Sequence, residues 1–242
     1  DAKCCCAGPF AVLSKLGDRF DEPWTPGEEG ANARFQAFLD EELLGYKTGR
    51  DRPDQSHVSR LSPHLHFGEI SPRQIWQETW SRIDQRAELQ RDGEKFLAEI
   101  GWREFSHHLL FHFPRLPSEN WNASFDNYPW VANSALVSAW QKGQTGYPLV
   151  DAGMRELWAT GYMHNRVRMV VASFLIKHLR QDWRVGADWF WDTLLDADLA
   201  NNSASWQWVA GCGADAAPYF RIFNPTTQAQ KFDPNGDYIR RW

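Results

Sequence analysis

The sequence predicts an all-α fold, and three observations support that prediction. Apolar residues follow a helical period, first at Phe35, Phe38, Leu39 and Leu43. This spacing places them on one face of a helix. Signals for helix starts and stops recur along the chain, and the alternation that marks half-buried strands is almost absent. We therefore expect helices joined by loops.

The first clear helix boundary lies at Ser71. This serine precedes Pro72, and Gln74 follows three residues later. A capping serine, a proline in the first turn and a glutamine at this distance form an N-terminal helix signature. The next helix is predicted over residues 93–112, and its apolar positions are Phe96, Ile100, Leu109 and Phe113.

Three more helices are predicted in the C-terminal half. Pro148 suits the first turn of a helix, and Gly161 suits the left-handed residue that ends it. The other two helices are expected over residues 165–180 and 187–195. Loops are expected at residues 49–63, 114–133 and 196–205. The second loop is long for a compact domain, and long ordered loops tend to serve function.

The composition is that of a globular protein, with 43% hydrophobic and 24% charged residues. The apolar stretch at 169–176 is far shorter than the roughly 20 residues that a membrane span needs. The N-terminus lacks the layout of a signal peptide, so a cytoplasmic protein is expected. Cys4–Cys6 and Cys212 have neither zinc-binding nor disulfide spacing, and we interpret them as free thiols.

The net charge of −5 argues against a nucleic-acid partner. The distribution weakens that argument, because residues 151–185 carry six basic residues against three acidic ones. Either a basic face or scattered solvated charge fits this pattern. The 14 tryptophans are unusual, and they fit either core packing or stacking platforms for planar ligands.

The common nucleotide-binding and zinc-protease motifs are absent. Glu104 and His107 have the spacing used in di-iron bundles, but such a site needs a second copy and two more glutamates. We therefore favour a helix-surface or core role for this pair and predict no metal site. Asp196 and Asp198 follow an apolar helix end, where they could cap a helix, bind a metal or hold a polar group.

Two groups of residues share a helix side. Glu99 lies one turn from Trp102 and Arg103, so these side chains project towards one neighbourhood. Asn165, Arg168 and Met169 also share a side of their helix, with Arg166 roughly opposite. Either group fits simple packing when taken alone.

Six segments together resemble the photolyase/cryptochrome family in order and spacing. They are residues 59–73, 102–105, 143–151, 163–169, 196–199 and 216–225. The resemblance runs from about Tyr46 to Trp242. It implies a helical domain over residues 41–242 that holds FAD in a folded conformation beside a cavity facing DNA. Residues 1–40 match poorly, no N-terminal α/β antenna domain is recognisable, and a further C-terminal segment is expected.

The resemblance also implies the residues that hold FAD. Tyr46 and the segment Val58 to Ser62 would lie on the pyrophosphate side, and Val58 stands where threonine is common. Arg168 and Asp196 would pair near the flavin ring, Asp198 would complete the polar wall, and Asn202 would face flavin N5. The full set of implied cofactor residues is Tyr46, Val58, Ser59, Arg60, Leu61, Ser62, Phe96, Arg103, Asn165, Arg168, Asp196, Ala197, Asp198 and Asn202.

The activity implied is light-driven repair of pyrimidine dimers in damaged DNA. Asn202 favours repair over signalling, because plant-type cryptochromes carry an aspartate there. Asn165 and Met169 favour cyclobutane dimers, because (6-4) photolyases carry histidine at both positions. Glu99 would bond the lesion, with Trp102 and Trp208 as apolar walls. The implied catalytic residues are Glu99, Asn202, Trp102, Trp208 and Met169.

Further roles follow from the same resemblance. Electrons would pass along Trp206, Trp183 and Trp130, in order from the flavin to the surface. The implied DNA-binding residues are Trp102, Arg103, Asn165, Arg166, Trp208, Arg221 and Lys231. We expect a monomer with no membrane partner. The alternatives are a cryptochrome-like photoreceptor without repair activity and a flavin- or DNA-binding helical module without catalysis.

Overall fold

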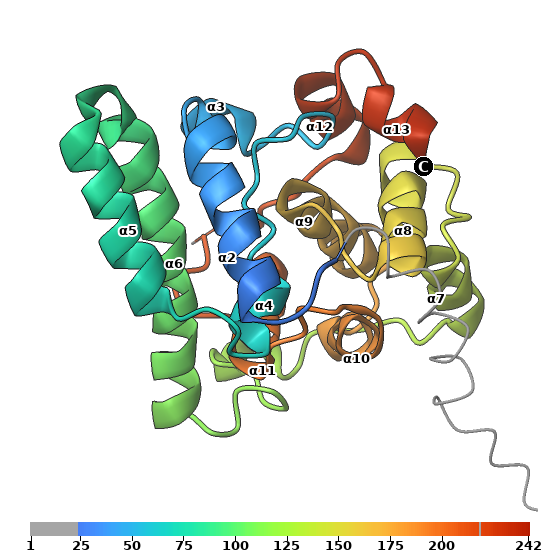
Figure 1. The fold of residues 1–242 in the computed structure, drawn as a ribbon. Helices are drawn as coiled ribbons and strands as arrows, with labels where there is room; N and C mark the ends of the chain where they lie inside the picture. The colour runs from blue at the N-terminus through green and yellow to red at the C-terminus, as the bar shows by residue number, and fades with distance from the viewer. Residues whose placement is uncertain (1–23, 218) are drawn as a thin grey trace, which may run out of the picture.

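The computed structural model describes residues 24–217 and 219–242 (Figure 1). Every regular element in these ranges is a helix, so the all-α prediction is confirmed. The α-helices are α2 (Glu28–Ala37), α3 (Tyr46–Gly49), α4 (Ser62–His66), α5 (Pro72–Gln85), α6 (Gln90–His112), α7 (Ser134–Gln141), α8 (Pro148–Thr160), α9 (Asn165–Ser173), α10 (Trp183–Thr193), α11 (Leu199–Ala210), α12 (Pro225–Phe232) and α13 (Asp237–Arg241). Shorter 3₁₀ turns lie at Ala87–Leu89 and Ala123–Phe125. Cys4–Cys6 and most of the predicted segment 1–40 lie outside the described residues.

The N-terminal half packs around one hydrophobic core. Helix α2 continues into a π-helical turn (Phe38–Glu42), and the four residues predicted to share its inner face are all buried. The rings of Phe38, Tyr46 and Phe96 meet with centroid separations of 4.7 to 5.6 Å. Helices α5 and α6 form a hairpin beside them (Figure 1). As predicted, the Ser71 hydroxyl accepts a hydrogen bond from Gln74 N and caps α5.

A second core joins α7 to α11. Helix α8 spans the predicted residues and ends at Gly161, whose φ of 65° is left-handed. Helices α8 and α9 approach closely at Gly153, where a Cβ atom would lie 2.4 Å from a methyl carbon of Val167. Helix α9 continues into a second π-helical turn (Phe174–His178). This half buries Trp140, Trp183 and Trp206, so part of the tryptophan excess is core packing.

Helix α11 connects the two halves, because it packs against α6, α9 and α10. Its Gln207 is fully buried and binds the long loop over residues 114–133. The Gln207 amide donates to the carbonyls of Leu116 and Glu119, at 2.7 and 2.9 Å, and accepts from Trp121 N at 2.8 Å. The loop therefore follows a fixed path beside α11.

Three sequence predictions need correction. The predicted loop 196–205 is wrong from Leu199 onward, because α11 begins there under a cap from Asp198, which accepts from Asn201 N at 2.8 Å. Helix α10 begins at Trp183 rather than 187, because Asp182 caps it. Phe113 follows the end of α6 and is 49% exposed, so it is not a core residue of that helix. The periodic apolar pattern therefore continues past His112, where α6 ends.

Cys212 is a buried free thiol, as interpreted from its spacing. Within residues 24–217 and 219–242, we found no group of three or more histidine, cysteine, aspartate or glutamate side chains arranged to hold a metal ion. In the same ranges, no helix combines the length and apolar composition needed to cross a membrane.

Candidate functional site

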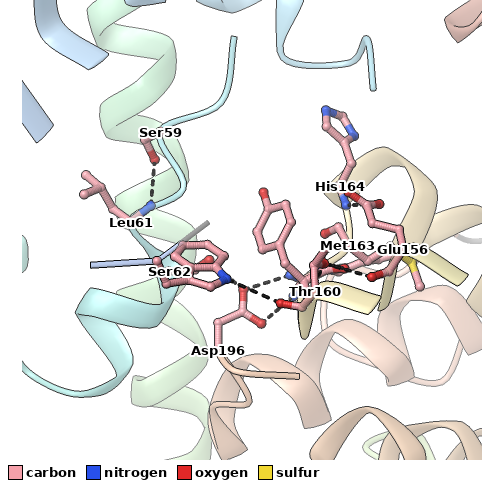
Figure 2. Close-up of polar contacts among 11 residues, drawn as sticks. Ser59, Leu61, Ser62, Glu156, Thr160, Met163, His164 and Asp196 are labelled. Atoms are coloured by element: carbon pink, nitrogen blue, oxygen red, sulfur yellow. Dashed lines mark hydrogen bonds and ion pairs between the residues drawn. The ribbon is translucent and has the colours of Figure 1, made fainter. Parts of the chain in front are cut away.

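A buried ion pair joins two of the predicted site residues. The Arg168 guanidinium on α9 meets both carboxylate oxygens of Asp196, with nitrogen to oxygen distances of 3.0 and 2.8 Å. Ser62 on α4 donates to the same carboxylate at 2.6 Å (Figure 2). The Asp196 side chain is only 2% exposed. Bidentate geometry and a third donor are what a buried carboxylate needs to stay ionised.

A second arginine lies beside this pair. The guanidinium carbons of Arg60 and Arg168 stand 5.5 and 5.2 Å from the ring centre of Tyr162. Burial raises the pKa of the Tyr162 phenol to about 12, so it stays protonated between the two cations. Arg60 has a left-handed φ of 53° and forms no ion pair with any residue in the described ranges. The cluster therefore contains one guanidinium without a carboxylate partner.

A cavity of about 250 Å³ opens beside Arg60. It lies between the start of α2 and α4, and its lining residues are Trp24, Thr25, Gly30, Ala33, Arg34, Arg60 and His64. Arg34 is held by Glu42 and by the carbonyls of Val58 and Ser59. The predicted segment Val58–Ser62 therefore reaches this cavity through Arg60, whose guanidinium has no carboxylate partner in the described residues.

His164 and Glu156 are buried polar residues at the N-terminus of α9. His164 caps α9 through Nδ1, which accepts from Arg166 N at 3.2 Å. Glu156 accepts from His164 N at 3.3 Å (Figure 2). It also accepts from the Tyr238 hydroxyl at 2.5 Å. Burial lowers the pKa of His164 from 6.5 to about 4, so the imidazole is neutral at pH 7. Burial raises the pKa of Glu156.

The buried His164 predicts a stability change with pH. Between pH 6.5 and 4 the unfolded chain binds a proton that the folded chain does not. The stability that neutral His164 contributes is therefore complete above pH 6.5 and falls as the pH is lowered, by up to about 1.4 kcal/mol per pH unit. His164→Asn keeps a capping acceptor but removes this titration. Urea unfolding of both proteins should give a steeper pH dependence for the wild type in this window.

Glu156 acts in the opposite sense, because its raised pKa makes acid favour the folded state. That contribution is present in both the wild type and His164→Asn, so it cancels in the comparison. Identical pH profiles for the two proteins would show that His164 titrates normally in the folded chain.

Glu99 lies on α6 between two cations. Its Oε1 is 2.6 Å from both Arg50 Nη1 and Lys95 Nζ. One turn further along α6, the Trp102 indole is half exposed and meets Phe105 edge to face. Arg103 pairs with Glu104 at the surface. The structure thus brings Glu99 and Trp102 to one open face of α6, whereas the Arg103 cation is engaged by its neighbour.

The N-terminus of α11 carries the next predicted residues. Asp198 accepts from Asn201 N and lies 3.2 Å from His107 Nε2 on α6. Capping is therefore one role of Asp198, as considered from the sequence. The Asn202 amide donates to Ala187 O on α10 at 2.9 Å. This bond fixes the orientation of a side chain that carries no titratable proton.

The three tryptophans predicted to relay electrons lie on different elements: Trp206 on α11, Trp183 on α10 and Trp130 in the long loop. Trp206 lies so close to α10 that a Cβ atom at Gly186 would be 2.1 Å from its ring. Trp183 is fully buried one turn before Gly186, and its indole donates to Asn120 Oδ1 at 2.9 Å. Trp130 is half buried against the same core, and Val131 N donates to Arg180 O just before α10. Trp206 and Trp183 therefore lie at the N-terminal end of α10, and the backbone beside Trp130 is bonded to the segment that precedes this helix.

The remaining predicted residues differ in accessibility. Asn165 is exposed at the start of α9, and Met169 one turn later is half buried. Arg166 is engaged inside the fold, by Asp51 at 2.8 Å and by the Phe232 ring at 4.4 Å. Two cations are exposed, Arg221 beside the Trp208 ring and Lys231 beside the Phe232 ring.

A protein-family model described as the FAD binding domain of DNA photolyase matches residues 96–242. The chain belongs to this family. FAD is therefore the cofactor of this domain, and the all-α architecture is the helical fold of photolyases.

Individual photolyases and cryptochromes are similar to the chain over nearly its whole length. It is 57% identical to a deoxyribodipyrimidine photo-lyase of Agrobacterium fabrum, over 92% of this chain and 46% of the relative. It is 42% identical to Cryptochrome-1 of Arabidopsis thaliana, over 100% of this chain and 37% of the relative. A crystal structure of a bacterial class III photolyase from Agrobacterium tumefaciens superposes with a TM-score of 0.90 and 56% identity, over 93% of this chain and 46% of that one. The chain spans about half the length of these photolyases.

The residues of this photolyase-family domain fit FAD. Arg60 offers a cation without a carboxylate partner in the described ranges, on the wall of the cavity beside Ser59–Ser62. Such a guanidinium, together with hydroxyls and backbone N–H groups, suits the charge of a pyrophosphate. The Arg168–Asp196 pair adds a rigid polar group nearby.

Several residues that make buried or long-range contacts were not predicted from the sequence. They are Trp24, Arg34, Asn120, Glu156, Tyr162, His164 and Gln207. Tyr162 and His164 lie within or beside the motif at 163–169, so that motif was the available signal. Trp24, Asn120 and Gln207 act through partners more than 60 residues away, and no local pattern marks such contacts.

Proposed function

We propose that this domain belongs to a deoxyribodipyrimidine photo-lyase that repairs cyclobutane pyrimidine dimers in DNA under light. The observation that carries the proposal is the open face of α6, where the Glu99 carboxylate and the half-exposed Trp102 indole lie one turn apart. A flipped pyrimidine dimer needs a polar partner and an apolar wall at one place. The similarity to a photo-lyase at 57% identity supports the same assignment.

When bound, reduced FAD supplies an electron to the dimer and receives it back after the ring has opened. The protein's own residues hold the lesion during this cycle. Glu99 accepts a hydrogen bond from the dimer, and its two cationic neighbours keep the carboxylate in position. Trp102 and Trp208 cover the apolar faces of the dimer. Asn165, Arg103, Arg166, Arg221 and Lys231 are proposed to contact the DNA, and of these Asn165, Arg221 and Lys231 are the most accessible.

The cofactor residues divide into two proposed groups. Tyr46, Phe96 and the segment Val58–Ser62 hold the phosphate side of FAD, with Arg60 as the cation. Arg168, Asp196, Ala197, Asp198 and Asn202 hold the flavin side, in a group fixed by the buried ion pair. This division makes the pyrophosphate pocket dependent on α4 and the flavin pocket dependent on α9 and α11.

The absence of histidine at positions 165 and 169 supports cyclobutane dimers as the substrate. Asn165 and Met169 cannot serve as acids on a (6-4) lesion, whereas splitting a cyclobutane ring needs no such acid. The second candidate is a cryptochrome-like photoreceptor, favoured by the 42% identity to Cryptochrome-1. Asn202 supports repair, because its amide cannot exchange a proton with the flavin.

A direct test uses the flavin-loaded protein and a DNA strand with one thymine dimer. Under near-ultraviolet or blue light, intact thymines should reappear by chromatography, whereas a sample kept dark should show none. FAD retention without repair would overturn the proposal and favour the photoreceptor. A (6-4) lesion in the same strand serves as the matched control and should persist.

Glu99→Ala is expected to lower dimer binding and repair roughly ten- to hundredfold, because a charge-assisted hydrogen bond of about 1.5–3 kcal/mol is lost. FAD content should stay unchanged. Glu94→Ala, an exposed position on the same helix, is the control and should repair normally. Repair yield per absorbed photon is the measurement. An unchanged yield in Glu99→Ala would remove this residue from the lesion site.

Trp206→Phe is expected to slow flavin photoreduction more than tenfold, because phenylalanine is much harder to oxidise than tryptophan. Trp206, Trp183 and Trp130 are proposed to pass electrons inward along α10. Trp76→Phe, on the exposed face of α5, is the control. Loss of flavin absorbance under blue light with an external reductant measures the rate. Normal photoreduction in Trp206→Phe would exclude the proposed relay.

A further inference from the structure

An aromatic contact extends beyond Trp130, the outermost tryptophan of the proposed relay. The ring centroids of Tyr128 and Trp130 lie 4.4 Å apart, with their planes at 49°. Both side chains are half buried. Tyr128 lies outside the six family motifs and outside the implied tryptophan relay. Its ring nevertheless touches the last tryptophan more closely than most aromatic pairs in this fold touch each other.

The backbone holds this contact in place. Trp130 N donates to Tyr128 O at 2.8 Å, which makes a tight turn around Pro129, and Tyr128 N donates to Phe125 O at 3.1 Å. Arg180 donates to Pro129 O at 2.9 Å and accepts from Val131 N at 2.8 Å. The backbone is therefore tied on both sides of Trp130 to Arg180, which lies three residues before the start of α10. A fixed turn keeps the two rings within electron-transfer contact.

The surroundings of Trp183 favour movement of positive charge outward. An oxidised indole is a far stronger acid than the neutral ring, and it is trapped where a base takes its proton. The partner of the Trp183 indole is the Asn120 amide, which is not a base, and Asn120 is itself bonded to Asp126. The guanidinium carbon of Arg184 lies 4.7 Å from the Trp183 ring centre. The Asn120 amide therefore gives the Trp183 indole no base to take its proton, and the Arg184 cation disfavours positive charge on the Trp183 ring.

We propose that Tyr128 is the terminal electron donor of the relay. This inference rests on the proposed relay of Trp206, Trp183 and Trp130. One electron passes from the Tyr128 ring to oxidised Trp130, which returns to its neutral form. Tyr128 releases its phenolic proton to water and is left as a neutral tyrosyl radical. Because the proton has gone, the electron returns slowly and the charge separation lasts longer.

The test is electron paramagnetic resonance of the flavin-loaded protein frozen under blue light. The wild type should give a tyrosyl signal, whereas Tyr128→Phe should give a tryptophan signal and a several-fold faster return to the dark state. Tyr147→Phe is the matched control, because Tyr147 is also partly exposed but contacts Phe174 instead. A tyrosyl signal unchanged in Tyr128→Phe would overturn the proposal.

Failure of the relay gives a different result. Tryptophan radicals without any tyrosyl signal in the wild type would overturn the role of Tyr128 while leaving the relay intact. If no tryptophan radical forms and Trp206→Phe photoreduces normally, both the relay and Tyr128's role fall. Repair of thymine dimers would be unaffected in either case, so the proposed enzyme activity is judged separately.

A second measurement needs no light. Azide radicals from pulse radiolysis oxidise tryptophan in the flavin-loaded protein, and transfer to tyrosine appears as decay of the tryptophan radical with growth of the tyrosyl radical. We expect this conversion to be several-fold smaller in Tyr128→Phe and Trp130→Phe, and unchanged in Tyr147→Phe. Equal conversion in all four proteins would overturn the proposed contact as a path for the electron.

Discussion

Replacing Asp196 with alanine is expected to destabilise the fold by roughly 3–5 kcal/mol and to abolish FAD retention. Asp196 is the carboxylate that neutralises Arg168, and its side chain is 2% exposed. Removing one partner of a buried pair leaves the other charge without compensation, which is the costly case. Ser62 also loses its acceptor. Urea unfolding and the flavin absorbance that remains after gel filtration measure the two effects.

Two matched variants separate this effect from general damage. Asp196→Asn keeps an acceptor for Ser62 and Arg168 but removes the charge, so it should lose less stability than the alanine variant. Asp237→Ala breaks an exposed ion pair with Arg240 and should cost less than about 1 kcal/mol. If Asp196→Ala unfolded at the wild-type urea concentration, the buried pair would contribute no net stability.

Gly186→Ala is expected to destabilise the protein by about 1–3 kcal/mol, the usual cost of overpacking a core. The added carbon would lie 2.1 to 2.7 Å from three atoms of the Trp206 ring, which is only 2% exposed. The ring or the helix has to shift, because real Cβ atoms essentially never approach another heavy atom within 3.0 Å. The same shift should slow flavin photoreduction, since Trp206 is proposed to be the first donor in the relay.

Gly101→Ala provides the control for this substitution. Gly101 lies within α6, and a Cβ atom there meets no atom within 4 Å. Alanine is the better helix former, so this variant should gain roughly 0.5–1 kcal/mol. Opposite signs for the two glycine variants would identify contact with Trp206 as the cause. Equal stability of Gly186→Ala and the wild type would mean that the Trp206 ring can move without cost.

The candidate site was only partly predictable from sequence. The six motifs led to Arg168 and Asp196, and the structure forms the ion pair that the resemblance implies. The same motifs gave no sign that Arg166 is engaged by Asp51. They also missed Tyr162, although it adjoins a recognised motif, because a buried tyrosine between two arginines has no local pattern. A sequence motif indicates which residues belong to the site. Which of their charges remain unpaired depends on residues from other segments of the chain.

The helix boundaries were likewise predictable only where the signal lies within a few residues. Ser71 and Gly161 were readable as helix ends because caps depend on residues within one turn. The start of α11 was missed because Asn201, Asn202 and Ser203 are poor helix formers. The Asp198 cap and the burial of Ser203 against the rest of the fold outweigh that preference.

By itself, the sequence determined the helical class, the family and most helix positions. Each of these depends on spacing within a few residues or on motifs kept in order. The tertiary structure alone decided that Ser62 meets Asp196 from 134 residues away, that Gln207 fixes the long loop, and that Tyr128 touches Trp130 in a turn held by Arg180. The physical reason is that local periodicity reports which side of a helix a residue occupies, whereas the partner it meets depends on how distant helices pack.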